Sequence, residues 1–175
     1  MGRAGRSRVV LRAPRPADEA EFAALVRRSR VFLRGWAAPP AARQKFKAYV
    51  ERSKRDDFRA YLVTRAGDGR IVGAFNVSQI FHGAYQCAFL GYWVGAEFAR
   101  QGYMSEGLRL VMREVFGPLK LHRIEANVQP DNGPSKALLR RAGFRLEGFS
   151  PRYLKIAGRW RDHERWALTR EEFRA

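Results

Sequence analysis

The chain has few of the residues that build disulfide frameworks and metal centres. Its 175 residues include one cysteine, Cys87, and three histidines, His82, His122 and His163. One cysteine cannot form an intramolecular disulfide, and a thiol inside an apolar strand is more often a buried side chain than a nucleophile. The histidines show no ligand spacing. We therefore expect no metal.

Long apolar runs are also missing. No uninterrupted apolar stretch approaches the roughly 20 residues that a membrane-spanning helix needs. The first residues, MGRAGRSRVVLR, lack the apolar middle of a signal peptide. We expect a cytoplasmic protein that makes no membrane contact.

Acidic residues are scarce. The 17 Asp and Glu residues stand against 34 Lys and Arg, which gives a formal net charge of +17. Charge of this size concerns partners and solubility rather than fold. It fits contact with RNA or a ribosomal surface, binding of a polyphosphorylated cofactor, or a solvated basic surface, and charge alone does not choose among them.

Length and composition predict one domain over residues 1–175, because the 46% hydrophobic content suffices for one core. Residues 1–7 form a basic N-terminal arm in this interpretation. Hydrophobic residues recur with helical or strand periodicity along the rest of the chain. The expected order is a strand at 9–11, helices at 18–33 and 42–54, strands at 61–63, 71–81 and 84–94, a helix at 103–115, a strand at 121–129, a short helix between 132 and 143, and strands at 144–156 and 160–168.

The stretch from Leu90 to Leu110 organises this series. It begins in a strand that is apolar on both faces, which is typical of the centre of a sheet covered by helices. It then passes through a short polar turn and enters a helix through Gly102. The first backbone N–H groups of such a helix have no intrahelical partner and favour a phosphate. The stretch therefore predicts an anion site.

The element order, with this turn after the fourth strand and Asn-x-x-Ser after the fifth, resembles the GNAT superfamily of acetyl-CoA-dependent N-acetyltransferases. Within it, the chain is similar to bacterial ribosomal-protein alanine N-acetyltransferases. The resemblance rests on SRVFLRGW (29–36), IVGAFNVSQI (71–80), LGYWVG (90–95), LHRIEANVQPDN (121–132), the S-x-x-L-L-x-x-x-GF segment (135–144) and GRWRDH (158–163). It implies an α/β (α+β) fold with a mixed, mostly antiparallel sheet, flanking helices and a splayed cofactor cleft.

The cofactor turn departs from the superfamily pattern Q/R-x-x-G-x-G/A. The matching residues run from Glu97 to Gly102, and only the last glycine is present. If the first glycine position requires positive φ, Arg100 costs on the order of 1–2 kcal/mol in backbone strain. Its charge near a phosphate would offset that cost. We expect acetyl-CoA binding to be retained, with Arg100 and the acid Glu97 as the residues that would weaken it.

The resemblance also implies roles for particular residues. The cofactor site would comprise Trp93, Val94, Arg100, Gln101, Gly102, Tyr103, Met104, Ser105, Asn132 and Ser135. Ser135, supported by Asn132, would protonate the departing thiolate, although it could equally be a first-turn residue that satisfies backbone donors. Glu125 is the candidate general base, since strand parity places it with Asn127 on a polar face. A backbone N–H near Val94 would stabilise the oxyanion.

Substrate contacts are expected from the first helix pair and the last hairpin. The candidates are Phe32, Trp36, Asn127, Tyr153, Trp160 and Asp162. Trp36 could instead belong to the core, and Asp162 could fix a loop rather than bind a peptide. Arg152 stands where related enzymes carry an acid, so it cannot be the base.

Three functions remain open at this stage. The first is acetylation of the N-terminal α-amine of a ribosomal or similar basic protein. The second is acetylation of a small amine such as an antibiotic, a polyamine or an amino acid. The third is a non-catalytic module that binds RNA or the ribosome through its basic surface. The acting species would be a monomer or a homodimer.

Overall fold

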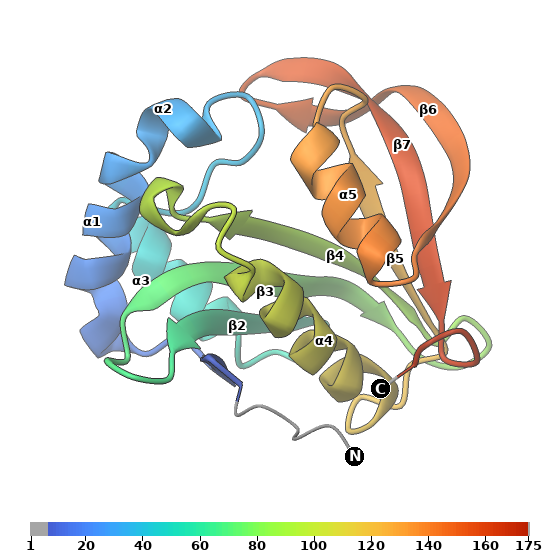
Figure 1. Cartoon of the computed structure of the whole chain (residues 1–175), viewed down its shortest axis with the longest axis horizontal. Coiled ribbons are helices and arrows are strands. Elements are labelled where there is room, and N and C mark those ends of the chain that lie inside the picture. Colours follow the sequence, from blue (N-terminus) through green and yellow to red (C-terminus); the bar gives the residue numbers. More distant parts are fainter. Residues whose placement is uncertain (1–6, 175) are drawn as a thin grey trace.

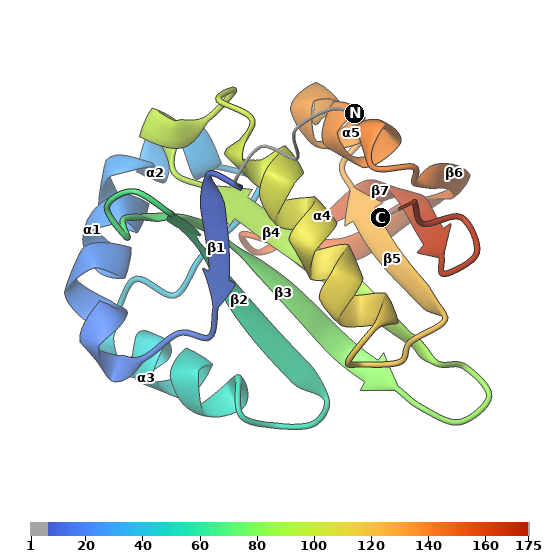
Figure 2. The same ribbon diagram turned by 60° about the horizontal axis from the view of Figure 1, so that its bottom comes forward.

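A mixed sheet of seven strands in the order β1-β2-β3-β4-β5-β7-β6 forms the centre of the fold (Figures 1 and 2). The computed structural model describes residues 7–174. Most of the basic arm expected at 1–7 therefore lies outside the described residues. The strands are β1 (Val9–Arg12), β2 (Phe58–Arg65), β3 (Ile71–Phe81), β4 (Cys87–Val94), β5 (Arg123–Val128), β6 (Arg145–Ile156) and β7 (Arg159–Thr169). Every neighbouring pair is antiparallel except β4 and β5.

Helices cover both faces of this sheet (Figure 2). They are the 3-10 turns η1 (Pro16–Asp18) and η2 (Ala96–Phe98) and the α-helices α1 (Glu19–Arg28), α2 (Arg30–Leu33), α3 (Arg43–Arg52), α4 (Tyr103–Phe116) and α5 (Gly133–Arg141). Phe22 of α1 packs between Phe46 of α3 and Trp93 of β4, with ring centroids 4.8 and 5.2 Å away. On the other face, Gly107 allows α4 to approach Phe75 of β3 closely. No helix in this part of the chain is long and apolar enough to cross a membrane.

The fold expected from the resemblance is confirmed, and two local expectations need correction. The helix expected at 18–33 is divided at Ser29, which is 1% exposed. The Ser29 hydroxyl accepts a hydrogen bond of 2.9 Å from the Ala96 amide, so it ties the helix pair to η2. The strand expected from residue 84 begins at Cys87, and Tyr85 is 77% exposed in the preceding turn.

The position of the candidate site follows from the way β4 and β5 diverge. β4 pairs with β3 from Phe89 to Val94. It pairs with β5 only at Cys87, Ala88 and Phe89. Beyond Phe89 the two parallel strands separate, and the edge of β4 that faces β5 has no strand partner. The expected central position of β4 and the splayed sheet are both present.

The entrance to α1 depends on an ion pair between Arg12 and Asp18. Both guanidinium N–H groups of Arg12 donate to the Asp18 carboxylate at 2.7 Å, and the Arg15 amide donates to it at 2.7 Å. Partial burial by itself raises the pKa of Asp18, but the hydrogen bonds from Arg12 and Arg15 lower this pKa below its ordinary value. The carboxylate form therefore stabilises the junction of β1 and α1.

Asp18→Asn should lower the free energy of unfolding by roughly 1–3 kcal/mol at pH 7, because it removes charged hydrogen bonds from a mostly buried site. Since the folded pKa lies below the unfolded value of about 3.9, the stabilisation is complete above that value. It is lost as pH falls through the folded pKa. Urea unfolding of both proteins between about pH 7 and pH 3 would measure this. Asp56→Asn is the control, because the Asp56 carboxylate is fully exposed; an equal loss in both variants would contradict the prediction.

Candidate active site

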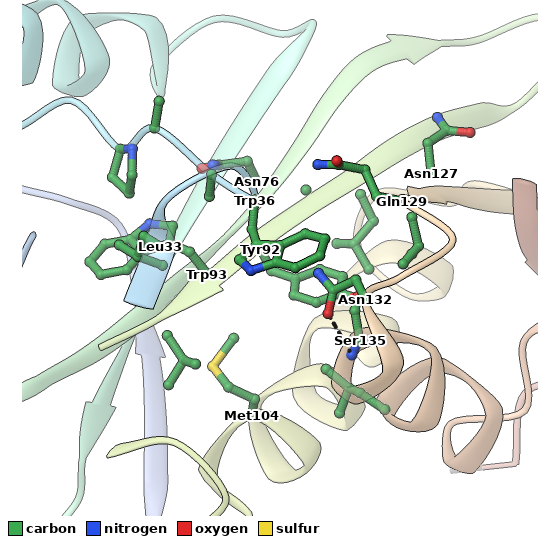
Figure 3. Close-up of a pocket in the computed structure, with 18 of the residues that line it drawn as sticks. Leu33, Trp36, Asn76, Tyr92, Trp93, Met104, Asn127, Gln129, Asn132 and Ser135 are labelled. Atoms are coloured by element: carbon green, nitrogen blue, oxygen red, sulfur yellow. Dashed lines mark hydrogen bonds between the residues drawn. The ribbon is translucent and has the colours of Figure 1, made fainter. Parts of the chain in front are cut away.

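A cavity of about 1430 Å³ occupies the gap between the separating halves of β4 and β5 (Figure 3). Residues from both sides of the sheet line it, so it passes through the sheet at the gap. We call the part lined by α4 and α5 the cofactor side. The part lined by α3, the α2–α3 connection and β6 is the acceptor side.

Two hydroxyl groups meet where α5 approaches β4. Asn132 is the N-cap of α5, and its side-chain oxygen accepts a hydrogen bond of 3.1 Å from the Ser135 amide (Figure 3). The hydroxyls of Ser135 and Tyr92 are 2.5 Å apart and share a hydrogen bond. Burial raises the pKa of Tyr92 to about 12, so this phenol stays protonated at neutral pH. The pair can therefore supply a proton to a leaving group in the cavity.

Tyr92 was not among the expected site residues. Its sequence context, a strand apolar on both faces, indicates packing, and its ring does lie 5.5 Å from that of Phe75. The signal that was available is strand parity, because Tyr92 alternates onto the same face as Leu90 and Val94. The contact with Ser135 could not be predicted, because it depends on where α5 crosses the gap.

The turn before α4 has the backbone geometry that a glycine-rich turn would provide. Arg100 has φ +61° and Gly102 has φ +85°. Positive φ at the first glycine position is thus present, with a side chain that rarely adopts it. Arg100, Gly102, Met104 and Ser105 all line the cavity. The start of a 14-residue helix and a nearby guanidinium together suit a phosphate group.

Two residues expected in the cofactor site turn their side chains elsewhere. The Gln101 amide group donates to the Glu97 carbonyl at 2.6 Å, and Gln101 is not among the cavity-lining residues. Tyr103 packs instead against the guanidinium of Arg8, 5.0 Å from the ring centroid. Only the backbone of these two residues belongs to the phosphate turn.

Glu97 does not face the cavity, which corrects the expectation that its charge lies beside the cofactor phosphates. Its carboxylate accepts hydrogen bonds from Arg28 at 2.9 Å and from Arg70 at 3.1 Å. The hydrogen bond from Arg28 is the main cause of a pKa below the ordinary glutamate value. Glu97 therefore joins α1, the start of β3 and the turn, and two arginines compensate its charge.

The acceptor side is aromatic and polar. Phe32, Trp36 and Tyr153 line it, as expected. Asn127 also lines it, and its buried side-chain oxygen has no hydrogen-bond partner in the described structure. This oxygen is covered by protein atoms, so a ligand can reach it only if the Asn127 side chain turns into the cavity.

The acceptor side is held in shape by two further hydrogen bonds. The Gln129 amide group donates to the Gly35 carbonyl at 2.7 Å, which ties the end of β5 to the connection after α2. The Tyr49 hydroxyl of α3 donates to the Asn76 side chain of β3 at 2.7 Å. These contacts join sequence segments far apart, so sequence periodicity could not identify them.

Besides Gln101 and Tyr103, three more expected site residues do not line the cavity. The Glu125 carboxylate accepts from the Arg123 guanidinium at 2.7 Å, where β4 and β5 still pair. Trp160 is 61% exposed on the last hairpin. Asp162 accepts a hydrogen bond of 2.7 Å from the Arg152 amide, so it has the loop-fixing contact rather than a place on the cavity wall.

His163 lines the cavity, although the spacing of the three histidines in the sequence gave no reason to select it. The residue is 3% exposed, and its Nδ1 lies 3.0 Å from the Arg161 carbonyl. A carbonyl accepts only, so Nδ1 carries a proton and donates it to that carbonyl. Nε2 of this cavity-lining ring has no hydrogen-bond partner among the described residues.

Charge on the cavity wall is mostly positive. Among the described lining residues, the only acidic one is Asp131, in the turn before α5. The basic lining residues are Lys45, Arg52, Arg100 and Arg141. No group of three or more His, Cys, Asp or Glu residues in the described chain is placed to hold a metal ion.

The turn before α4, a pair of hydroxyls and an open strand edge thus face one gap, an arrangement that suits acyl transfer. The sequence profile of the acetyltransferase (GNAT) domain matches residues 8–145, and the chain belongs to this family. It is a GNAT N-acetyltransferase that uses acetyl-CoA. The family, the enzyme class and the cosubstrate expected from the sequence are confirmed.

Individual relatives place the chain more closely. It is 40% identical to the probable N-acetyltransferase YjcK of Bacillus subtilis over 126 residues, which are 72% of this chain and 70% of YjcK. It is 40% identical to the ribosomal protein uS5-alanine N-acetyltransferase of Escherichia coli over 99 residues, 57% of this chain and about half (51%) of that enzyme. The solved structure of Mycobacterium smegmatis RimJ with CoA-disulfide superposes with a TM-score of 0.87 at 31% identity, covering 94% of this chain and 83% of that one.

Arg100→Gly should weaken acetyl-CoA binding about fivefold, because it removes one charge-assisted contact of roughly 1 kcal/mol. It should not lower the melting temperature of the free protein, because glycine relieves the positive-φ strain. Arg100→Ala is the matched control: it also removes the charge but keeps the strained Cβ, so it should melt at a lower temperature than Arg100→Gly. Titration calorimetry and thermal unfolding measure both effects. Unchanged cofactor affinity and activity in Arg100→Gly would refute the assignment.

Proposed function

We propose that this acetyltransferase, acting as one domain over residues 1–175, modifies the N-terminal α-amine of a ribosomal or similar basic protein. The observation that carries the proposal is the lack of a carboxylate among the described lining residues of the acceptor side. An α-amine with a pKa near 8 is about one-tenth neutral at pH 7, a penalty of roughly 1.4 kcal/mol. A lysine amine with a pKa of about 10.4 would incur nearly 4.6 kcal/mol. A site with a weak base therefore suits an α-amine better than a lysine amine.

The proposed reaction is direct attack of the neutral amine on the thioester carbonyl. The Asn127 side chain turns its oxygen, which is buried without a partner, into the cavity and accepts a hydrogen bond from the amine. Nε2 of His163, directly or through a water molecule, takes the proton that the amine loses. This role replaces the one expected for Glu125, whose carboxylate is held by Arg123.

The other two demands of the reaction fall on β4 and α5. A backbone N–H of β4 near Val94, on the edge that β5 leaves unpaired, donates to the oxyanion. Ser135 donates its hydroxyl proton to the departing thiolate and takes one from Tyr92, which lies 2.5 Å away, and water that enters as CoA leaves returns a proton to the Tyr92 oxygen. Asn132 keeps Ser135 in place by capping α5.

The charge of the cavity wall argues against one alternative function, and the pair of hydroxyls argues against another. A polyamine carries several positive charges, and the cavity wall offers Lys45, Arg52, Arg100 and Arg141 against the single acid Asp131. A non-catalytic RNA-binding module would have no use for the Ser135–Tyr92 pair. The name of the Escherichia coli relative, which acts on an alanine of a ribosomal protein, supports an α-amine of a ribosomal protein.

Peptides that begin with alanine or serine should be acetylated. Their kcat/KM should be at least about 10²-fold higher than that of control peptides that have a blocked N-terminus and one free lysine, because a much larger fraction of an α-amine than of a lysine amine is neutral at pH 7. Mass spectrometry would locate the acetyl group, and spermidine would test the small-amine alternative. Preferred turnover of lysine or spermidine would exclude the proposal. Salt-sensitive RNA binding without any thermal shift on adding acetyl-CoA would favour the non-catalytic module.

Ser135→Ala should lower kcat about 10²-fold, the usual contribution of a positioned acid, and should change the dissociation constant of acetyl-CoA less than about threefold. Tyr92→Phe should lower kcat less, because Ser135 keeps its own proton. Ser135→Thr retains a hydroxyl and should recover most of the activity. Loss of cofactor binding in parallel with kcat in Ser135→Ala would instead indicate a purely structural role.

A further inference from the structure

Three arginines of β7 stand on the face that carries the acceptor side of the cavity. Arg161 pairs with Leu154 and Arg159 pairs with Ile156, and both of these partners line the cavity. Arg165 pairs with Asn127, the residue with the unpartnered buried oxygen. Directly paired residues project from the same face of a sheet, with Cβ atoms about 4.5–5.5 Å apart. The arginines therefore continue the acceptor wall outward.

These arginines are exposed, and none of them has a carboxylate within ion-pair distance in the described structure. The acids between them alternate onto the opposite face of β7. Asp162 accepts from the Arg152 amide, and Glu164 pairs with Lys136 of α5 at 3.1 Å. One face of the strand thus carries positive charge without compensation.

The opposite wall of the acceptor side is also basic. Lys45 and Arg52 of α3 line the cavity, beside the exposed aromatic rings of Phe32 and Trp36. The β6–β7 hairpin reaches toward α2 in Figure 1, so the cavity opens between these two basic walls. A chain that leaves the cavity in this direction passes between positive charges on both sides.

We propose that the acceptor polypeptide carries acidic side chains in the first few positions after its acetylated residue, and that Arg159, Arg161 and Arg165 bind them. The proposal rests on the proposed function and narrows its substrate class. A protein that is basic overall can still begin with acidic residues. The stretch from Arg165 to Arg159 spans about 20 Å at about 3.3 Å per residue, which suits an extended peptide of about six residues.

A peptide fits these observations better than RNA. The strand partners of all three arginines, Asn127, Leu154 and Ile156, line the cavity, so the row runs along its edge. The chain that follows an acetylated N-terminus must leave the cavity past this row, whereas RNA has no aliphatic amine to place in the cavity. RNA binding by the same arginines is therefore an outcome of the test.

The test uses the full chain and three peptides that share an N-terminal alanine and differ at positions three and four, which are Glu-Glu, Gln-Gln or Arg-Arg. We expect kcat/KM to fall in that order, by about threefold to tenfold at each step, as for rim charges of opposite and like sign. The order should flatten in about 0.5 M salt, because exposed charges are screened.

Arg161→Glu should reduce the advantage of the Glu-Glu peptide over the Arg-Arg peptide by at least about threefold, because it lowers the charge of the row from +3 to +1. Lys155→Glu is the matched control. It makes the same charge change on the same hairpin, but Lys155 pairs with Trp160 on the opposite face and should keep the original advantage. The melting temperature and the acetyl-CoA affinity of both variants show whether fold and cofactor site are intact.

Separate outcomes overturn the two proposals. Efficient acetylation of all three peptides at equal rates would refute the acidic acceptor and leave α-amine acetylation standing. Failure with every free N-terminus would refute the proposed function itself. Unchanged peptide kinetics in Arg161→Glu, together with at least about threefold weaker binding of single-stranded RNA, would assign the arginine row to RNA instead.

Discussion

The separation of β4 from β5 after Phe89 is the constraint on which the rest of the site depends. Two parallel strands that stayed paired would close the sheet and leave no cavity. Because they diverge, the edge of β4 keeps backbone groups for a ligand, and α5 can bring Ser135 against Tyr92 through the gap. The gap also joins the cofactor side to the acceptor side, so two substrates can meet from opposite faces of one sheet.

The arginines of the chain fall into two groups, according to whether they form ion pairs. Some arginines hold acids in structural pairs, as Arg12 holds Asp18 and as Arg28 and Arg70 hold Glu97. Others remain uncompensated where a negative ligand is expected, at Arg100 in the phosphate turn and along β7. Net charge by itself therefore does not locate the ligand-binding surfaces, because it does not tell which arginines are paired with acids and which are not.

The cofactor turn shows which structural properties a sequence motif predicts and which it does not. The departure at Arg100 correctly pointed to a strained backbone, since φ is +61° there. The expectation for Glu97 was wrong, because a carboxylate that is next to an anion site in the sequence need not face that site in the structure. Its actual contacts are Arg28 and Arg70, which lie 69 and 27 residues away along the chain. Local backbone demands follow from residue type, whereas side-chain direction follows from distant partners.

The sequence by itself determined the element order, the central position of β4 and, through its resemblance to a family, the fold and the cosubstrate. These follow from periodicity and motif spacing, which are local. Only the tertiary structure decided that Glu125 is paired away from the cavity, that His163 and Tyr92 line it, and that Asn127 has an unsatisfied oxygen. Each of these depends on strand register and on the crossing of elements far apart in the chain, which local patterns do not encode.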